Sequence, residues 1–429
     1  MFKTLRNAWS IPDLRHRILY TLLMIFVFRL GSYIPVPGLR EGALQQWIGD
    51  GTTNNLFTML NAFSGGAFAN ATIFAMGITP YINSSIIMQL LTVAIPALER
   101  LSKEGEEGRK VIAKWTRFAT VILAFIQATG LYFALRGSLT YSSAVLGYIT
   151  IVATFTAGTA FLMWLGEQIT DKGIGNGISM IIFAGIVASL PSTIASLIAN
   201  FTMSTANIIT SIVVVIVALL MVVFVVFMDN AERRIPVQYA KRMVGRKMYG
   251  GQSTHIPIKV VMAGVIPIIF AMSILSFPTT IMSFMGYDPM AGKGWWNAIL
   301  RQFATTSPVY MILYFLLIVF FTYFYTAIQF NPVEISNNLK RNGGFVPGIR
   351  PGRPTSDYIA KILTRITLVG AFFLGIVAVL PMLLSVTMSN PAMYAVGGSS
   401  LLIVVGVALE TTKQLESQML MRHYKGFLE

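Results

Sequence analysis

Long stretches without a single charged side chain constrain this sequence more than any other feature. Such stretches cover residues 174–199, 206–228, 260–287 and 302–333. A helix of about 20 apolar residues crosses the hydrocarbon core of a membrane, which is about 30 Å thick. Only 11% of the residues are charged, against roughly 25% in an ordinary soluble domain. We therefore predict a protein whose helices cross a membrane many times.

Two uncharged stretches have the wrong length for one crossing. Residues 366–409 are about twice as long as one span, and the turn-forming residues 389–391 interrupt them, which predicts two spans. Residues 51–98 begin with a polar, glycine-broken part, and only 71–96 form a continuous apolar segment long enough to cross. We therefore predict one span there, preceded by a re-entrant half-helix.

Ten predicted spans account for the chain. The N-terminal segment is charged and then apolar, as in a signal peptide, but no small-x-small cleavage site follows it, so we expect it to be retained as the first span. The spans cover about 17–35, 71–96, 118–135, 148–166, 174–199, 206–228, 260–284, 308–330, 364–386 and 397–412. Pro80, Pro267, Pro278 and Pro381 lie within spans and are candidate kinks.

The positive charges lie mainly on one side of this topology. With the N-terminus inside, 27 of the 32 Lys and Arg residues lie in inner segments, and the outer loops hold only Arg40, Arg136, Lys293 and Arg301. Inner loops of membrane proteins carry such an excess of Lys and Arg. We therefore expect both termini in the cytoplasm, and a net charge of +15 there that attracts anionic lipid or RNA.

The predicted spans hold almost no ionisable side chain. Arg29 is the only one in mid-span. Ion-coupled transporters place Asp, Glu, Lys or His inside their spans, and an intramembrane enzyme needs a catalytic pair or a metal there. The chain has no cysteine, and His16, His255 and His423 lie in polar segments beside spans. We therefore expect no catalytic activity, no metal and no cofactor.

Four stretches of the sequence together resemble one known family. They are GGAFANATIFAMGITPYINSSIIMQLL (65–91), LGEQITDKGIGNGIS (165–179), QSTHIPIKVVMAGVIPIIFA (252–271) and FNPVEISNNLKRNGGFVPGIRPG (330–352). In sequence and order they resemble SecY, the family of central subunits of the bacterial protein-conducting channel.

The resemblance implies a fold. It is an all-α polytopic membrane protein with ten transmembrane helices in two inverted five-helix halves around a central pore, with a re-entrant plug segment at about 56–70. The halves are residues 1–200 and 201–429. An inverted repeat requires an odd number of spans in each half, and the predicted topology has five.

The resemblance also implies how the pore is closed. A ring of aliphatic side chains narrows it, formed by Ile78, Ile82, Ile178, Ile182, Ile269 and Ile403. The plug closes its outer side and contains Leu60, Phe63, Gly65, Gly66 and Phe68. A narrow apolar collar can dewet and block ions while it stays deformable.

A lateral gate and a docking surface are further implications of the resemblance. The gate lies between the second and seventh spans, with Asn83, Asn176, Ser273 and Phe277 as its contacts. The docking surface is formed by the basic inner loops 229–259 and 331–365, with Arg246, Lys247 and Arg350 as partner-binding residues. The implied partners are SecE- and SecG-like small membrane subunits, the SecA motor ATPase, the ribosome through rRNA phosphates, signal sequences and nascent polypeptides, and anionic lipids.

We therefore expect a channel of the cell (plasma or inner) membrane without activity of its own. It passes unfolded secretory polypeptides and releases transmembrane segments sideways into lipid, with energy from SecA or a translating ribosome. A solute or lipid permease with ten spans is the alternative. The lack of intramembrane charge other than Arg29 counts against ion coupling, and co-purification with SecE- and SecG-like subunits would favour the channel.

Overall fold

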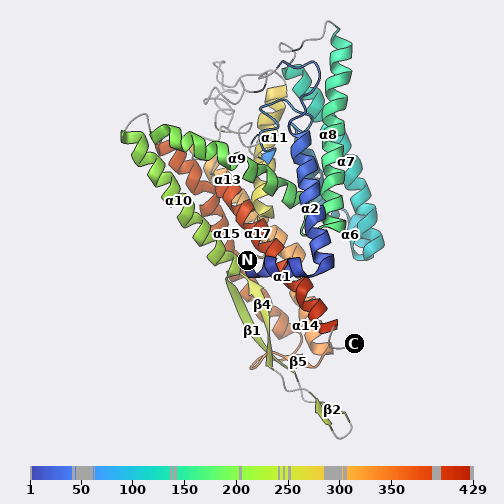
Figure 1. The fold of residues 1–429 in the computed structure, drawn as a ribbon. Coiled ribbons are helices and arrows are strands. Elements are labelled where there is room, and N and C mark those ends of the chain that lie inside the picture. Colours follow the sequence, from blue (N-terminus) through green and yellow to red (C-terminus); the bar gives the residue numbers. More distant parts are fainter. Residues whose placement is uncertain are drawn as a thin grey trace.

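The protein is a largely helical molecule with a small sheet at one end, which we call the sheet end (Figure 1). The computed structural model describes residues 2–40, 44, 61, 63–135, 139, 143–201, 205–239, 242–244, 247–249, 253–284, 302, 307–388 and 398–425. The short helix α1 (Phe2–Ser10) packs against α2 and α17, on the side of the helices that faces the sheet end.

Each predicted span overlaps one helix. The helices are α2 (Pro12–Gly31), α5 (Thr79–Ala94), α7 (Glu106–Ala134), α8 (Ala144–Lys172), α9 (Gly177–Phe201), α10 (Thr205–Asn230), α11 (Ile266–Phe284), α13 (Pro308–Gln329), α15 (Arg353–Met388) and α17 (Gly398–Lys425). Within the described residues, six helices are long and apolar enough to cross a membrane, or seven if α5 and α6 (Pro96–Lys103) form one bent span. The count of ten spans stays a prediction.

Two predicted spans begin with residues that are not helical. Residues 71–78 form turns and a bridge before α5, and residues 260–265 precede α11. Pro80 and Pro267 therefore lie in the first turns of these helices, where the missing N–H has no helical partner to lose. They start helices, so the prediction that they are kinks is wrong. The other two predicted prolines lie inside α11 and α15.

A sharp bend separates α5 from α6. The two helices meet at 101° across Ile95, whose backbone is extended with φ −108° and ψ 113°. Proline disfavours the helical conformation of the residue before it, so Pro96 accounts for the break. The second helix carries Glu99, Arg100 and Lys103, which suits a position at the surface of the membrane.

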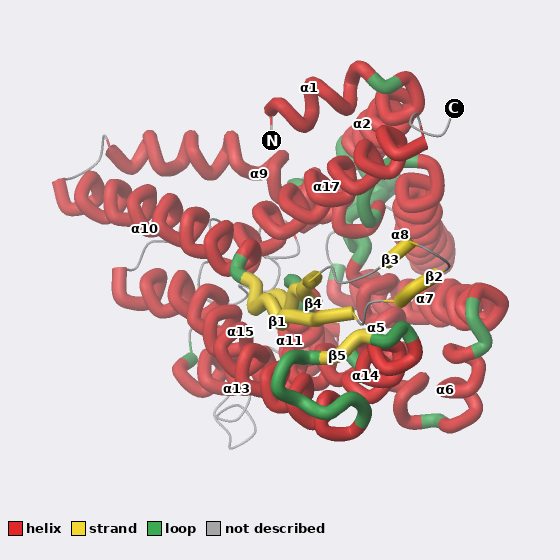
Figure 2. The backbone as a smooth tube through the Cα atoms, turned by 90° about the horizontal axis from the view of Figure 1, so that it is seen from below, coloured by secondary structure: helices red, strands yellow, loops and turns green. Residues whose placement is uncertain are grey.

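The sheet end combines two segments that are far apart in the sequence. β1 (Glu232–Tyr239) pairs antiparallel with both β4 (Ser253–Lys259) and β5 (Gly344–Phe345), and these strands lie side by side in Figure 2. β2 (Arg242–Val244) and β3 (Lys247–Tyr249) form a short hairpin beyond them. α14 (Pro332–Arg341) and the start of α15 complete a small apolar core of Ile235, Val237, Ile258, Leu339, Val346, Ile359 and Leu363.

These strands correct the expectation that residues 229–259 and 331–365 are loops of an all-α protein. Along β1, the buried Ile235 and Val237 alternate with exposed neighbours. This alternation is typical of a half-buried strand, so the signal was present in the sequence. The two predicted docking loops thus form one folded unit.

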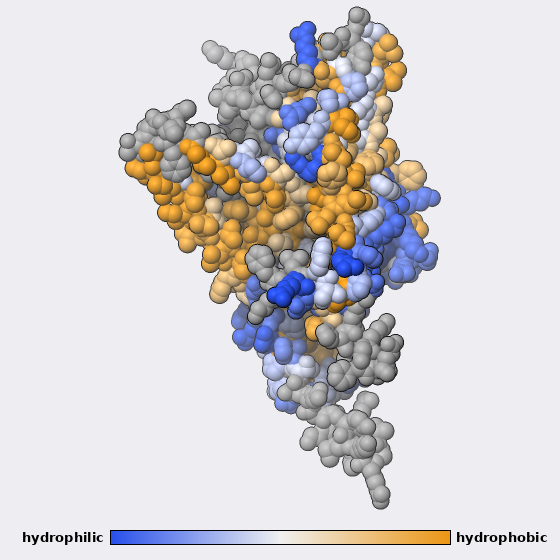
Figure 3. Space-filling model, in the orientation of Figure 1, coloured by the Kyte–Doolittle hydropathy of each residue, from blue (hydrophilic) through white to orange (hydrophobic). Residues whose placement is uncertain are grey.

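The helices expose a broad apolar surface. Large apolar side chains are exposed along α2, α7 and α10, among them Phe26, Ile122 and Phe227 at 60%, 60% and 70%. Figure 3 shows this apolar surface over the helices and hydrophilic side chains toward the sheet end. An apolar surface of this extent needs lipid around it, because monomeric soluble proteins rarely expose large apolar patches.

We predict that Val237→Asp opens the folded unit at the sheet end. Val237 is fully buried, and an uncompensated charge there costs about 3 kcal/mol or more. Trypsin should cut residues 232–259 and 331–365 of the purified protein faster. Gln238→Asp changes the exposed neighbour on the same strand and should leave the cleavage rate unchanged. Equal cleavage of the two variants would contradict the shared core.

Candidate functional site

Five isoleucines from four helical segments surround one small cavity. Ile78 and Ile82 come from the start of α5, Ile182 from α9, Ile269 from α11 and Ile403 from α17. Phe63, Ser64, Gly77 and Thr79 complete the lining. The cavity has a volume of about 20 Å³, which is room for about one water molecule.

Helix periodicity explains part of this convergence. The Ile82 N–H donates to the Ile78 carbonyl oxygen at 3.1 Å, so the two side chains lie one turn apart on the same face. Ile178 and Ile182 are also four residues apart and were predicted to face the pore together, but Ile178 does not line the cavity. It packs beside Gly166 of α8, within the same apolar cluster. The structure thus brings five of the six predicted ring residues to one space.

The segment of residues 63–70 reaches this cavity at its N-terminal end. Phe63 and Ser64 line it directly, and the Ser64 hydroxyl oxygen accepts a hydrogen bond from the Phe68 N–H at 3.1 Å. Gly65 and Gly66 have φ of +66° and +89°, a conformation that other residues rarely adopt. Residues 61 and 63 are helical and residues 64–70 form successive turns, while residues 56–60 and 62 of the predicted half-helix lie outside the described residues.

Arg29 contacts the same segment. It lies in the last turn of α2, which ends at Gly31. Its Nη1 donates to the Gly65 carbonyl oxygen at 2.9 Å, and its Nη2 donates to the Tyr33 hydroxyl at 3.1 Å. The one charge predicted in mid-span is thus bound to the segment at the cavity.

The predicted gate residues have different surroundings. α11 packs against both α5 and α7. Asn83 of α5 has a buried Oδ1 without a hydrogen-bond partner among the described residues, and Ser273 of α11 is half-buried. The Asn83 Oδ1 therefore forms no polar latch with Ser273.

Asn176 caps the start of α9. Its Oδ1 accepts hydrogen bonds from the N–H groups of Ile178 and Ser179 at 3.1 and 3.3 Å. Asparagine is a preferred residue at this position, because its side chain satisfies N–H groups that the helix leaves unpaired. The gate prediction did not foresee this capping contact.

A second cavity, of about 370 Å³, lies next to the sheet end. Its polar side includes Asp229, Lys259, Glu410 and Lys413, and its apolar side is formed by α10, α11, α15 and α17. Lys413 Nζ lies 2.8 Å from Asp229 Oδ2 and joins α17 to α10. Sequence reasoning missed this cavity. The only signal was that all four charges lie at or next to the ends of predicted spans.

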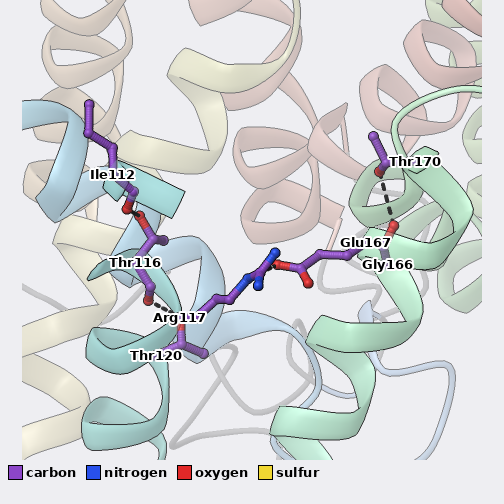
Figure 4. A network of polar contacts seen from close by, with 7 residues as sticks. All are labelled: Ile112, Thr116, Arg117, Thr120, Gly166, Glu167 and Thr170. Carbon is purple, nitrogen blue, oxygen red and sulfur yellow. Dashed lines mark hydrogen bonds and ion pairs between the residues drawn. The ribbon is translucent and has the colours of Figure 1, made fainter. Parts of the chain in front are cut away.

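A further ion pair joins α7 to α8. Arg117 Nε donates to Glu167 Oε1 at 2.6 Å, and the two side chains point toward one another in Figure 4. The nearby Thr116 and Thr170 instead donate to backbone carbonyls one turn back. Both charges lie directly outside the predicted third and fourth spans, where long side chains can reach water.

Arg350 lies on an exposed turn of the sheet end. The Ile349 N–H donates to the Val346 carbonyl oxygen at 3.0 Å, and Gly348 has φ of +81°. The Arg350 carbonyl oxygen accepts a hydrogen bond from Thr355 Oγ1 at 2.8 Å. These bonds fix the backbone, while the Arg350 side chain is exposed.

The structure describes four predicted site residues only in part or not at all. Leu60 and Arg246 lie outside the described residues, and Lys247 of β3 and Phe277 of α11 have side chains that are not described. Within the described part of the chain, no group of three or more His, Cys, Asp or Glu could hold a metal ion.

Comparisons with known proteins identify the family. A SecY family model matches residues 72–412. The protein translocase subunit SecY of Halalkalibacterium halodurans is 48% identical over the full length of both chains. A solved SecY structure, described as having a plug domain that stabilises the closed state of the translocation channel and maintains a membrane seal, covers 94% of this chain and 92% of its own, with a TM-score of 0.65 and 17% identity. Sec61 from a canine ribosome-channel complex of the endoplasmic reticulum covers the same shares, with a TM-score of 0.62 and 17% identity.

The fold and the sequence relationship define a multi-pass membrane channel that conducts proteins, and not an enzyme. The chain belongs to the SecY family. The expected channel function is therefore confirmed, and the alternative of a solute or lipid permease is wrong.

Proposed function

We propose that unfolded secretory polypeptides pass through the cavity between the five isoleucines. The observation that carries this proposal is the convergence of Ile78, Ile82, Ile182, Ile269 and Ile403 around a space of about 20 Å³. A path for arbitrary sequences must not bind any one side chain strongly, and branched apolar groups offer neither hydrogen bonds nor charge. The same contacts exclude all but about one water molecule and so oppose ion flow at rest.

Residues 56–70 act as the plug in this proposal. Phe63 and Ser64 line the isoleucine cavity, and Phe68 is buried at 3% exposure. The related SecY structure is described with a plug domain that maintains a membrane seal. A segment that touches the ring from one side is well placed to supplement its apolar seal.

The proposed topology has cytoplasmic termini and two halves, residues 1–200 and 201–429. The excess of Lys and Arg in the inner segments supports this orientation. The boundary of the halves falls close to the connection between α9 and α10. In this orientation the sheet end faces the cytoplasm.

The proposed partners follow from family membership. They are SecE- and SecG-like small membrane subunits, SecA or a ribosome at the sheet end, signal sequences and nascent chains, and anionic lipids. The related Sec61 comes from a ribosome-channel complex, which supports a ribosome as one kind of partner.

We predict that the combined replacement of Ile82, Ile182 and Ile403 by serine makes the resting channel leak ions. Serine is smaller and can be hydrated, so the cavity widens and the dewetting barrier falls. A barrier lower by about 1.4 kcal/mol raises the rate about tenfold. The measurement is the conductance of purified channels in planar bilayers.

Ile186→Ser is the control for the ring. Ile186 is buried at 2% exposure, against 4% for Ile182, and lies one turn after Ile182 on α9, but it does not line the cavity. It should lower stability without a leak. Parental conductance in the triple variant, or an equal leak in the control, would remove the ring from the proposal.

We propose that α5 and α11 separate to form the lateral gate. We predict that cysteines at Asn83 and Ser273 form a bridge on oxidation that blocks export, and that reduction restores it. The chain has no cysteine of its own, and a bridge needs Cα atoms within about 7 Å. Export should be measured in vesicles, with the two single-cysteine variants under the same oxidant as controls. Export that continues through a fully bridged channel would contradict lateral opening here.

We propose that Arg350 contacts the cytosolic partner. A guanidinium on a fixed, exposed turn can bind a carboxylate or phosphate with two parallel hydrogen bonds, which a lysine cannot reproduce. Lys247 and Arg246 belong to the same proposed surface. Any contact with rRNA there would be to phosphates, without sequence specificity.

We predict that Arg350→Glu lowers ATP-dependent translocation about tenfold or more, because like charges at an interface cost several kcal/mol. The protein should still fold, since the side chain is exposed. Translocation is measured in vesicles of equal channel content. Arg353→Glu makes the same charge change three residues away, in the first turn of α15 where an acidic residue is tolerated, and should transport normally. Equal damage in the two variants would indicate only a general basic face.

A further inference from the structure

We propose that Arg29 is a positioning residue that holds the plug in its closed position. This inference rests on the proposed role of residues 56–70 as the plug. Arg29 Nη1 donates to the Gly65 carbonyl oxygen at 2.9 Å. It thereby joins α2, a helix that contributes nothing to the lining of the isoleucine cavity, to the segment that touches that cavity.

Tyr33, two residues beyond α2, and the end of α2 itself orient the Arg29 guanidinium. Its Nη2 donates to the Tyr33 hydroxyl at 3.1 Å, and Arg29 Cζ lies 5.3 Å from the centroid of the Tyr33 ring. Arg29 is also in the last turn of the helix, where the helix dipole attracts a cation. The side chain is therefore held with its remaining N–H groups toward the segment.

The backbone at Gly65 is shaped to receive this contact. Consecutive positive φ angles at Gly65 and Gly66 turn the chain sharply. A side chain at Gly65 would come within 2.7 Å of Arg29 Nη1 and 3.1 Å of the Gly185 Cα atom on α9. A side chain at Gly185 would in turn clash with the Phe63 carbonyl oxygen. The segment thus lies between α2 and α9, in contact with both.

The hydrogen bond between Arg29 and Gly65 favours the closed state, because its loss would leave the Arg29 cation with fewer partners. Hydrogen bonds to a charged group are stronger than those between neutral groups, and a cation near hydrocarbon is costly without partners. If the segment moved away, Arg29 would lose its bond to Gly65 and, among the described residues, keep the bond to Tyr33. The contact is a single main-chain hydrogen bond, so it can bias the plug without locking it.

The test is the resting conductance of purified channels in planar bilayers. Arg29→Gln removes the charge and should raise the leak about tenfold, which corresponds to about 1.4 kcal/mol. Deletion of residues 61–70 should leak at least as much. When residues 61–70 are deleted, Arg29→Gln should raise the conductance no further, because Gly65, which Arg29 holds, is gone.

The outcomes separate two proposals: the latch, which is the contact of Arg29 with Gly65, and the plug, which is residues 56–70. A leak from the deletion with none from Arg29→Gln would overturn the latch and leave the plug. A further leak from Arg29→Gln in the deletion background would also overturn the latch, because Arg29 would then act elsewhere. No leak from the deletion would overturn the proposed plug itself.

A second readout follows the position of the segment directly. Ala67 is fully buried in the segment and Leu162 is fully buried in α8, within the same apolar cluster. Single cysteines at these positions should both resist a membrane-impermeant maleimide added from the outer side. Arg29→Gln should speed labelling of Ala67→Cys about tenfold, the same factor as the leak, and leave Leu162→Cys protected. Faster labelling at both sites would indicate general unfolding and overturn the latch, and so would unchanged labelling at Ala67→Cys.

Discussion

Contact between branched apolar side chains, at the point where α5, α9, α11 and α17 meet, is the interaction on which the rest of the structure depends. Apolar contact has no direction, and its strength follows the area removed from water. Isoleucines can therefore part around a passing chain and close again without specific bonds to re-form. A polar seal would hold water and bind some substrates more than others. The central cavity accordingly has almost no polar group except at Ser64 and Thr79.

Two ion pairs that join helices lie away from this centre. Arg117 pairs with Glu167 between α7 and α8, and Asp229 pairs with Lys413 between α10 and α17. Each pair is near the helix ends that the predicted topology places on the inner side, where water lowers the cost of a charge. Helices tied together at their ends can separate at the middle without breaking these pairs. Of the four helices around the cavity, α17 alone takes part in one of these two pairs, so the pairs leave the isoleucines free to part.

The sequence predicted the positions of the helices because long apolar runs admit few other structures in a membrane. It also predicted the pairing of Ile78 and Ile82, since helical periodicity places residues four apart on one face. The same argument paired Ile178 with Ile182; in the structure Ile182 lines the cavity, while the packing of α9 on α8 places Ile178 against Gly166. Helix rotation depends on packing between distant segments, which one sequence does not reveal.

Other features were missed for related reasons. The charge of residues 229–259 concealed the alternating pattern of β1, and its pairing with β5 joins strands about 100 residues apart. The second cavity, next to the sheet end, could not be derived from the sequence either, because six helices contribute to its lining. Arg29 was noticed as an exception, but only the turn at Gly65 and Gly66 explains its position.

Irregular backbone at the depth of the helices is possible only where protein encloses it, because lipid cannot satisfy free N–H and carbonyl groups. Residues 63–78 meet this condition through glycines on their neighbours. A side chain at Gly158 of α8 would clash with the Ile73 carbonyl oxygen, and one at Gly185 of α9 would clash with that of Phe63. Small residues let backbones approach closely within a membrane. The enclosure that makes this segment tolerable also holds it against α8 and α9, so movement of the segment must break these close contacts.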